Sequence, residues 1–314
     1  MLRYVAKRIL EVIPTTLGIL LLTFVLFNVV SGGSPALTIL GKGADEQSIA
    51  AFNRRYGYDK PLLIGDEHFF DSQFFRFVGD FATGNLGWST KLDEPVADVL
   101  ARGVGPSLSL TVPILGLGVV FALFLALLSA AYRGRVPDKV ILFMSAALMS
   151  VNYVVWVLLG QFLLAFKAGW FPIWGYEGWV YLVLPVAIGI LSSLGTDVRF
   201  FRAAILDEVY KPYVVTARAK GLSRAAIMTR HVLRNALIPI VTYVSLSIPY
   251  LFTGSLLLES FFGIPGLGSV SINAIQSADL AVVRAVVVLG ALVYQFVNLV
   301  TDLLYAFLDP RVAL

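Results

Sequence analysis

The feature that most limits how this chain can fold is a set of six long apolar runs. Each reaches the length of about 20 residues that a helix needs to cross the hydrocarbon core of a bilayer. Hydrophobic residues make up 58% of the 314 residues and charged residues only 14%, a composition typical of a polytopic membrane protein. We therefore predict an all-α integral membrane protein, a single domain over residues 1–314, with six transmembrane helices near Ile9–Val30, Ser107–Ala131, Val140–Phe166, Trp179–Val198, Leu237–Leu258 and Ala285–Leu308.

The first apolar run could also belong to a secretory signal peptide, because Arg3, Lys7 and Arg8 form a positive segment before it. However, Ile13–Val30 is longer than the apolar core of a signal peptide, which has about 7–15 residues. No clear cleavage site with small residues follows it. We therefore favour an uncleaved first helix.

The distribution of Lys and Arg predicts the orientation of the chain. With the N-terminus in the cytosol, the cytosolic segments hold 15 of the 24 cationic residues and the opposite side holds nine. Seven of those nine lie in residues 31–105, a long segment that also carries ten acidic residues. Long loops contribute little to the positive-inside rule. We therefore expect both termini to be cytosolic.

Several functional classes are excluded by residues that the chain lacks. It has no cysteine and only two histidines, which excludes disulfides, thiolate catalysis and any Cys-based or His-rich metal centre. The isoelectric point near 9.2 could suggest a nucleic-acid partner, but the basic residues gather beside apolar runs, where topology explains them. We predict no metal site, no bound cofactor and no nucleic-acid partner.

Residues 31–105 differ in composition from the rest of the chain, with a net charge of −3 and many aromatic side chains. Turn signals such as Gly32-Gly33 and Gly84–Gly87 divide the segment. One interpretation is a small folded cap whose aromatic residues form its own core. The other is a surface that receives an external partner, and the two are compatible.

A cytosolic loop over residues 199–236 carries eight of the 24 cationic residues. Pro212 can begin a short helix over Tyr213–Lys220, and Gly221 can end it in a left-handed conformation. Ser223 can cap a second helix that runs over Arg224–Ala236 into the fifth apolar run. Binding of anionic lipid headgroups by a positive-inside loop would explain the charge of this segment, but not its helix-break-helix pattern.

The first of these helices is predicted to be amphipathic. We expect Val214, Val215 and Ala217 to face one way, while Arg218 and Lys220 project elsewhere. Such a helix suits a docking surface for another protein better than it suits a simple connection between two membrane spans.

This loop resembles the cytoplasmic signature loop of the permease subunits of ABC importers. The strings Tyr213–Leu222 and His231–Ala236 match the variant found in dipeptide, oligopeptide and nickel permeases, although the glutamate and first alanine of the general pattern are missing. The resemblance covers essentially the full chain and is to the first of the two permease subunits. It also includes Lys7–Leu10, Tyr56–Leu62, Gly84–Ser89, Pro265–Gly268 and Asp309–Arg311.

The resemblance implies the pore-forming subunit of an ATP-driven importer that couples ATPase closure to alternating access. The substrates that it implies are peptides. Its partners would be a second homologous permease, two ATPase subunits that carry ATP and Mg²⁺, an extracytoplasmic substrate-binding protein and membrane lipid. The location would be a bacterial or archaeal cell (inner) membrane. The residues that would couple to the ATPase are Tyr213, Thr216, Ala217, Arg218, Ala219, Lys220, Gly221 and Leu222.

Other candidate residues follow from position. Tyr56 and Trp88 in the external segment are candidates for docking the binding protein, and Asn152 and Gln161 are polar residues in the third apolar run that could line the pore. The chain has no glycine-lysine phosphate loop, so we do not expect it to hydrolyse ATP itself.

Three alternatives remain open from the sequence. Within the same family, the substrate could be nickel or glutathione. A secondary transporter would require inverted repeats or broken helices with ion-binding groups, and no internal repeat is visible. An intramembrane protease is disfavoured because no metal-ligand cluster or pair of central carboxylates is present.

Overall fold

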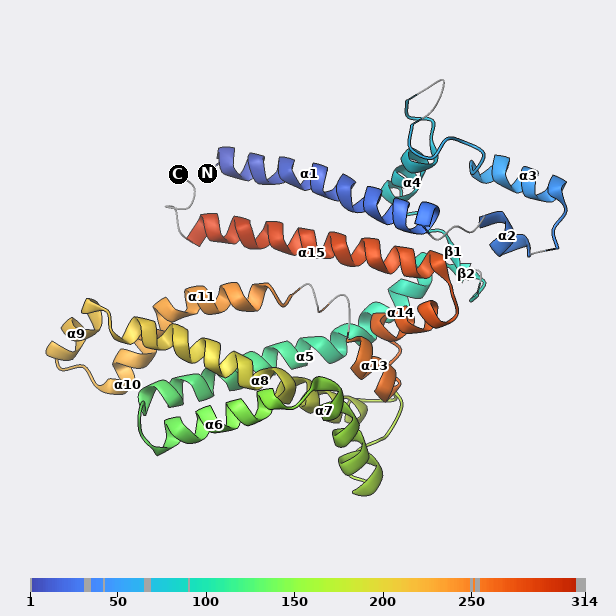
Figure 1. The fold of residues 1–314 in the computed structure, drawn as a ribbon. Helices are drawn as coiled ribbons and strands as arrows, with labels where there is room; N and C mark the ends of the chain where they lie inside the picture. Colours follow the sequence, from blue (N-terminus) through green and yellow to red (C-terminus); the bar gives the residue numbers. More distant parts are fainter. Residues whose placement is uncertain are drawn as a thin grey trace. The chain divides into compact units, whose positions relative to one another are not determined.

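The computed structural model describes residues 2–30, 35–41, 43–64, 69–89, 91–248, 251 and 255–308. The described chain is helical apart from one antiparallel pair of two-residue strands, β1 (Trp88–Ser89) and β2 (Glu94–Pro95). It divides into two compact units (Figure 1). Unit 1 comprises residues 1–103 and 270–314, and unit 2 comprises residues 104–269.

Unit 1 is built on two long helices that run side by side, α1 (Leu2–Phe24) and α15 (Leu280–Leu308) (Figure 1). The π-helix η1 (Val25–Val30) extends α1. The two helices are held together by side-chain packing and by the Gln295 amide of α15. This amide donates hydrogen bonds to the carbonyl oxygen of Val12 and to the Thr15 hydroxyl, both in α1. This unit also contains three short helices, α2 (Pro35–Leu40), α3 (Glu46–Tyr56) and α4 (Gln73–Ala82).

Helix α4 packs on the ends of α1 and α15 through a shared aromatic cluster. Phe24 is fully buried and meets Phe74 of α4 edge to face, with ring centroids 5.6 Å apart. Leu20 of α1 and Val288 of α15 complete the cluster. Phe75, Phe77 and Phe81 also pack against this cluster, whereas Phe69, Phe70 and Trp88 are exposed. Some aromatic residues of the segment 31–105 thus form a core, but one that they share with α1 and α15 rather than a core of the segment's own.

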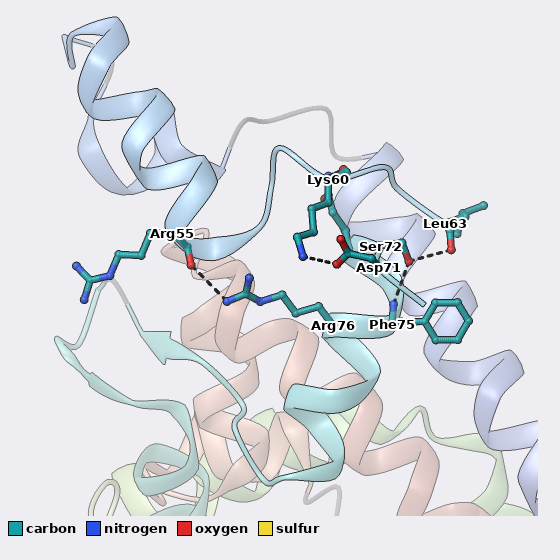
Figure 2. Close-up of polar contacts among 8 residues, drawn as sticks. Arg55, Lys60, Leu63, Asp71, Ser72, Phe75 and Arg76 are labelled. Atoms are coloured by element: carbon teal, nitrogen blue, oxygen red, sulfur yellow. Dashed lines mark hydrogen bonds and ion pairs between the residues drawn. The ribbon is translucent and has the colours of Figure 1, made fainter. Parts of the chain in front are cut away.

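Polar contacts fix the chain that leads into α4 (Figure 2). Lys60 pairs with Asp71, and the Ser72 hydroxyl donates to the carbonyl oxygen of Leu63 at 2.9 Å. The same hydroxyl accepts from the Phe75 amide and so caps α4. Arg76 reaches back from α4 to the carbonyl oxygen of Arg55 at the end of α3.

Unit 2 packs helices of the middle of the chain around an apolar core. Most of α5 (Val96–Ala131) lies in it, followed by α6 (Val136–Ser150), α7 (Tyr153–Gly160) with the π-helix η2 (Gln161–Lys167), and α8 (Val180–Val209). Helices α6 and α8 cross closely, since a Cβ on Gly195 would lie 2.5 Å from the carbonyl oxygen of Ser145. The small residues Ala122, Ala126 and Ala130 of α5 face the same core, as is common between membrane helices.

The remaining helices of unit 2 begin with the short α9 (Pro212–Ala219). Then α10 (Arg224–Ala226), the π-helix η3 (Ile227–Val232) and α11 (Leu233–Ser245) follow one another without a break. Helix α13 (Leu256–Phe262) ends at Gly263, and α14 (Leu267–Gln276) begins in unit 2 and ends in unit 1.

Four described helices are long and apolar enough to cross a membrane, namely Leu10–Asn28, Val96–Ala131, Val180–Val209 and Leu280–Thr301. They correspond to the first, second, fourth and sixth predicted spans. Two further pairs of helices qualify only if each bent pair is counted as one span. The structure thus has four to six spans, and the number six stays a prediction.

The third and fifth predicted spans differ most from straight helices. In the third, α6 and the α7–η2 helix meet at 90°, because the Asn152 side chain accepts from the Val154 amide and starts a new helix. In the fifth, α11 ends at Ser245, and Leu256–Leu258 already belongs to α13. A hydropathy average over such runs cannot detect one capping residue.

Candidate functional site: the basic loop

The predicted helix, break and second helix of the basic loop are all present. Lys211 has an extended backbone at the N-cap of α9, and Pro212 occupies its first turn. Gly221 has a φ of +77°, the left-handed conformation that glycine adopts without strain. The Ser223 hydroxyl then accepts from the Ala226 amide at 3.3 Å and caps the next helix.

Helix α9 is anchored on one face and exposed on the other. Val214 and Ala217 are buried in the core of unit 2, against residues that include Phe201 and Ile227. The prediction that Val215 shares this face is wrong, because its side chain is 64% exposed. Successive helical residues are turned by about 100°, so positions 214 and 217 align while 215 points away.

The exposed face of α9 and the turn after it combine apolar and cationic side chains. Val215 and Leu222 supply apolar surface, and Thr216, Arg218, Ala219 and Lys220 are exposed beside them. No ion pair links Arg218 or Lys220 to a residue in the described part of the chain. A hollow of about 490 Å³ lies next to this face and is lined by residues that include Arg218, Leu222 and Arg224.

The start of α9 is tied to the end of α8 by Glu208. Its carboxylate accepts hydrogen bonds from the Lys211 ammonium and from the Tyr213 hydroxyl, the latter at 2.7 Å. The bond to Glu208 raises the pKa of Lys211, and burial raises the pKa of the Tyr213 hydroxyl. The Lys211 charge is thus engaged within the loop, whereas the charges of Arg218 and Lys220 face outward.

A buried ion pair fixes α8 to the turn between α5 and α6. The Arg202 guanidinium donates to both Asp138 carboxylate oxygens, at 2.9 and 3.0 Å, and to the Ser129 hydroxyl at 2.8 Å. Asp138 also accepts from the Gly134 amide at 2.8 Å. Sequence reasoning missed this pair, because Arg202 and Asp138 are far apart in sequence and each resembles an ordinary charge at the end of a span.

The helix that follows Ser223 connects the loop directly to a long helix of the same unit. Residues of η3 and α11, including Met228, Val232 and Ala236, are buried in the same core as Val214 and Ala217. Because α10, η3 and α11 are continuous, α9 is connected to α11 both by the shared core and by the helix that begins after Ser223. This confirms the local structure predicted for the second helix, with a π-helical stretch added.

The two predicted pore-lining residues have other contacts in the structure. Asn152 caps α7 as described above. The Gln161 amide donates to the carbonyl oxygens of Ile173 and Phe261, at 3.0 and 2.7 Å, and so joins η2 to α13. Whether either side chain also borders a transport path stays a prediction.

The two predicted docking residues lie in unit 1. The Trp88 side chain is 53% exposed, and its indole N–H donates to the Asp93 carboxylate at 3.1 Å. The backbone of Tyr56 ends α3, but its side chain lies outside the described part of the structure. The exposure of Trp88 is compatible with a contact surface.

A buried carboxylate organises the turn from α13 to α14. Glu259 is fully buried and accepts from the Ser107 hydroxyl at 2.8 Å. It also accepts from the backbone amides of Ser255, Gly268 and Ser269, at 2.9, 2.6 and 3.1 Å. No local sequence pattern identifies this network, because the Ser107 partner lies 152 positions away.

Comparison with known proteins agrees with the structure. Residues 118–314 match the family "Binding-protein-dependent transport system inner membrane component", and residues 1–111 match its N-terminal companion family. The chain is also similar to the glutathione transport system permease protein GsiC of Shigella flexneri, Escherichia coli and Salmonella paratyphi A. In each comparison it is 33% identical over 315 residues, with 99% of both chains covered. The chain therefore belongs to the binding-protein-dependent inner-membrane permeases, the peptide/nickel type of ABC importer permease.

Proposed function

We propose that this permease takes up small peptides and that its α9 helix transmits the closure of ATPase subunits to the membrane spans. The observation that carries the proposal is that α9 is anchored on one face and exposed on the other. One face is packed into the core of unit 2, and the other presents Val215, Arg218 and Leu222 to the surroundings. A short helix held in this way can move as one body with α8 and α11 when a partner pushes on it.

The proposed assembly has four kinds of partner. A second homologous permease completes the pore, two ATPase subunits carry ATP and Mg²⁺ and bind the α9 surface, and an extracytoplasmic binding protein delivers the substrate. Both termini and residues 199–236 lie in the cytosol, and the membrane is a bacterial or archaeal inner membrane. Residues 1–314 act in it as a single permease domain, with Tyr56 and Trp88 at the surface that meets the binding protein.

Glutathione is the substrate that we propose first within the peptide class. It is the substrate named for the relatives, which are similar over their whole length. A longer peptide is the second candidate, because the binding protein in such systems does much of the selection.

The ATPase contact can be tested by co-purification from detergent. Val215→Glu and Leu222→Glu each place a carboxylate on the exposed apolar face of α9 without disturbing Val214 or Ala217. We expect both variants to recover less ATPase while recovering the second permease normally. Val136→Glu is the matched control, since Val136 is 72% exposed in the α5–α6 region. Full ATPase recovery by both α9 variants would remove α9 from the contact.

A further inference from the structure

Unit 1 contains a cavity of about 650 Å³. The transport proposal uses only one of its lining residues, Trp88, and gives the cavity itself no role. Its size falls within the range of about 300–1,000 Å³ found for pockets that bind small molecules. The π-helix η1 and helices α3, α4 and α15 contribute to its walls. The lining includes two cations, Arg76 and Arg284, one carboxylate, Asp80, and the rings of Phe77 and Trp88.

Arg284 is the most informative residue of this cavity. Its guanidinium lies over the Phe77 ring, 5.3 Å from the centroid, and its side chain is partly buried. Within the described ranges, no hydrogen bond or ion pair satisfies its N–H groups. A guanidinium carries five N–H donors in a fork that fits a phosphate or carboxylate, and leaving them unpaired in a partly dry cavity is unfavourable.

The other polar groups of the cavity are already partly engaged. Arg76 donates to the carbonyl oxygen of Arg55 at 3.3 Å, and Asp80 accepts from the Asn85 amide at 3.3 Å. Two cations face one carboxylate, so the cavity carries a net positive charge. It is therefore complementary to an anion, and Arg284 has the free donors to bind one.

The position of Arg284 indicates which kind of anion the cavity would bind. It lies in the second turn of α15, at the beginning of the candidate span Leu280–Thr301. Ala285 and Val288, the next lining residues on α15, are apolar, and Trp88 and Tyr58 at the cavity are aromatic residues with polar tips, the kind that gather at membrane interfaces. A group with an anionic head and an apolar tail fits this change in polarity.

We infer that the Arg284 cavity binds the phosphate of an anionic phospholipid headgroup. The guanidinium forms charge-assisted hydrogen bonds with phosphate oxygens, and the glycerol region lies along the apolar α15 wall. A free phosphate ion shares the headgroup chemistry but not the apolar part. This inference stands apart from the transport proposal, because it depends only on unit 1 and on α15 as a span.

The inference can be tested on the purified, delipidated full-length complex by native mass spectrometry. The probes are phosphatidylglycerol, a diacylglycerol with the same acyl chains, and inorganic phosphate. We expect phosphatidylglycerol to bind the wild type about tenfold more tightly than it binds Arg284→Gln, the ratio for loss of a charge-assisted contact. Lys167→Gln, which removes an exposed cation outside the cavity, should bind like the wild type.

The two other probes separate the possible sources of the anion. Diacylglycerol should bind the wild type about tenfold more weakly than phosphatidylglycerol, and phosphate should displace the lipid only in large excess. Equal binding of diacylglycerol would show that the walls bind any acyl chain, and displacement by phosphate at the lipid's own concentration would identify a free-anion site. Either result overturns the inference, as does unchanged binding in Arg284→Gln.

A second variant keeps the test decisive if Arg284→Gln does not assemble. Ala281→Trp would fill the cavity from the α15 side and leave both cations in place. We expect it also to lose phosphatidylglycerol binding by about tenfold. Wild-type binding in an assembled Ala281→Trp complex would place the lipid elsewhere and overturn the inference.

Discussion

At the scale of single residues, the function proposed for the basic loop around α9 requires a particular backbone conformation at Gly221. Gly221 has a φ of +77°, and a Cβ there would meet nothing within 4 Å. The chain itself therefore leaves room for a side chain at position 221. What disfavours other residues there is the positive φ of the backbone. A β-branched residue in the left-handed region costs about 1–2 kcal/mol.

We predict that Gly221→Val lowers uptake per ATP hydrolysed by up to about tenfold, because the turn after α9 is strained. Gly221→Asn is the control, since asparagine tolerates this conformation, and it should stay near the wild type. The measurement is uptake and ATPase activity in the same reconstituted vesicles, with assembly checked separately. Wild-type coupling by an assembled Gly221→Val complex would refute the prediction. If Gly221→Asn lowers uptake per ATP hydrolysed as much as Gly221→Val does, the cause is a clash of the side chain with the partner rather than backbone strain.

Glu259 carries a prediction about stability. The Ser107 hydroxyl accepts from the Leu267 amide at 2.8 Å, so its own hydrogen is donated to Glu259. All four contacts of the carboxylate are therefore donors, and its two oxygens offer acceptors to all of them. Glu259→Gln replaces one acceptor oxygen with an NH₂ group, which cannot accept from these donors. We expect it to lower the free energy of unfolding by roughly 2 kcal/mol.

The effect is measured as a lower midpoint of thermal unfolding in detergent. Glu177→Gln is the matched control, because Glu177 is exposed and accepts one long hydrogen bond, from the Tyr181 hydroxyl at 3.4 Å. If both variants unfold at the wild-type temperature, the buried network contributes little to stability.

At the scale of elements, the Asp138–Arg202 pair joins α6 to α8, and the Ser129 hydroxyl adds α5 to the same contact. The side chain of Asp138 is 5% exposed and that of Arg202 is 17% exposed. Removing one partner of a buried pair leaves an uncompensated charge and costs about 3–5 kcal/mol. The pair should thus make α6 and α8 move together.

We predict that Asp138→Asn and Arg202→Met each lower stability by about 3 kcal/mol and that the double variant loses less than their sum. Denaturant unfolding in detergent measures the double-mutant cycle. Lys211→Met, which breaks the more exposed pair with Glu208, should leave the midpoint unchanged within error. Additive losses from Asp138→Asn and Arg202→Met would show that the two side chains do not act as a pair.

Sequence patterns predicted some elements well and others poorly, for physical reasons. Pro212, Gly221 and Ser223 act through local backbone preferences, so the helix, break and cap could be located from sequence. The exposed position of Val215 follows from helical geometry alone. The prediction from sequence did not take that geometry into account. The contacts of Gln161 and Glu259 depend on partners 100 and 152 positions away, and no local pattern encodes these. The bend at Asn152 is local, since its side chain accepts from the Val154 amide, but an average over a long apolar run hides one polar residue.

At the scale of the whole molecule, the apolar runs determined the class of fold, and four of the six predicted spans correspond to long helices. The number of crossings depends on how the two bent pairs lie in the bilayer, which length and hydropathy do not decide. Helix α5 begins at Val96, before the predicted start of the second span at Ser107, so this helix extends into the segment that the sequence predicts to be external.

The orientation gives a prediction that the absence of cysteine makes simple to test. Single cysteines at Gln47 in α3 and at Arg224 in α10, both exposed positions, should react with a membrane-impermeant thiol reagent from opposite sides. The expected result follows from the excess of Lys and Arg in residues 199–234. Labelling of both positions from the same side would reject the proposed topology.

The central claim is that ATP hydrolysis by partner subunits drives import through this chain. The most direct test reconstitutes the chain with its second permease and ATPase subunits in vesicles and adds the binding protein with labelled glutathione or a short peptide. We predict that substrate accumulates only when ATP reaches the ATPase side and that a protonophore does not prevent it. Accumulation without ATP, driven by a proton or sodium gradient, would contradict the account and indicate a secondary transporter.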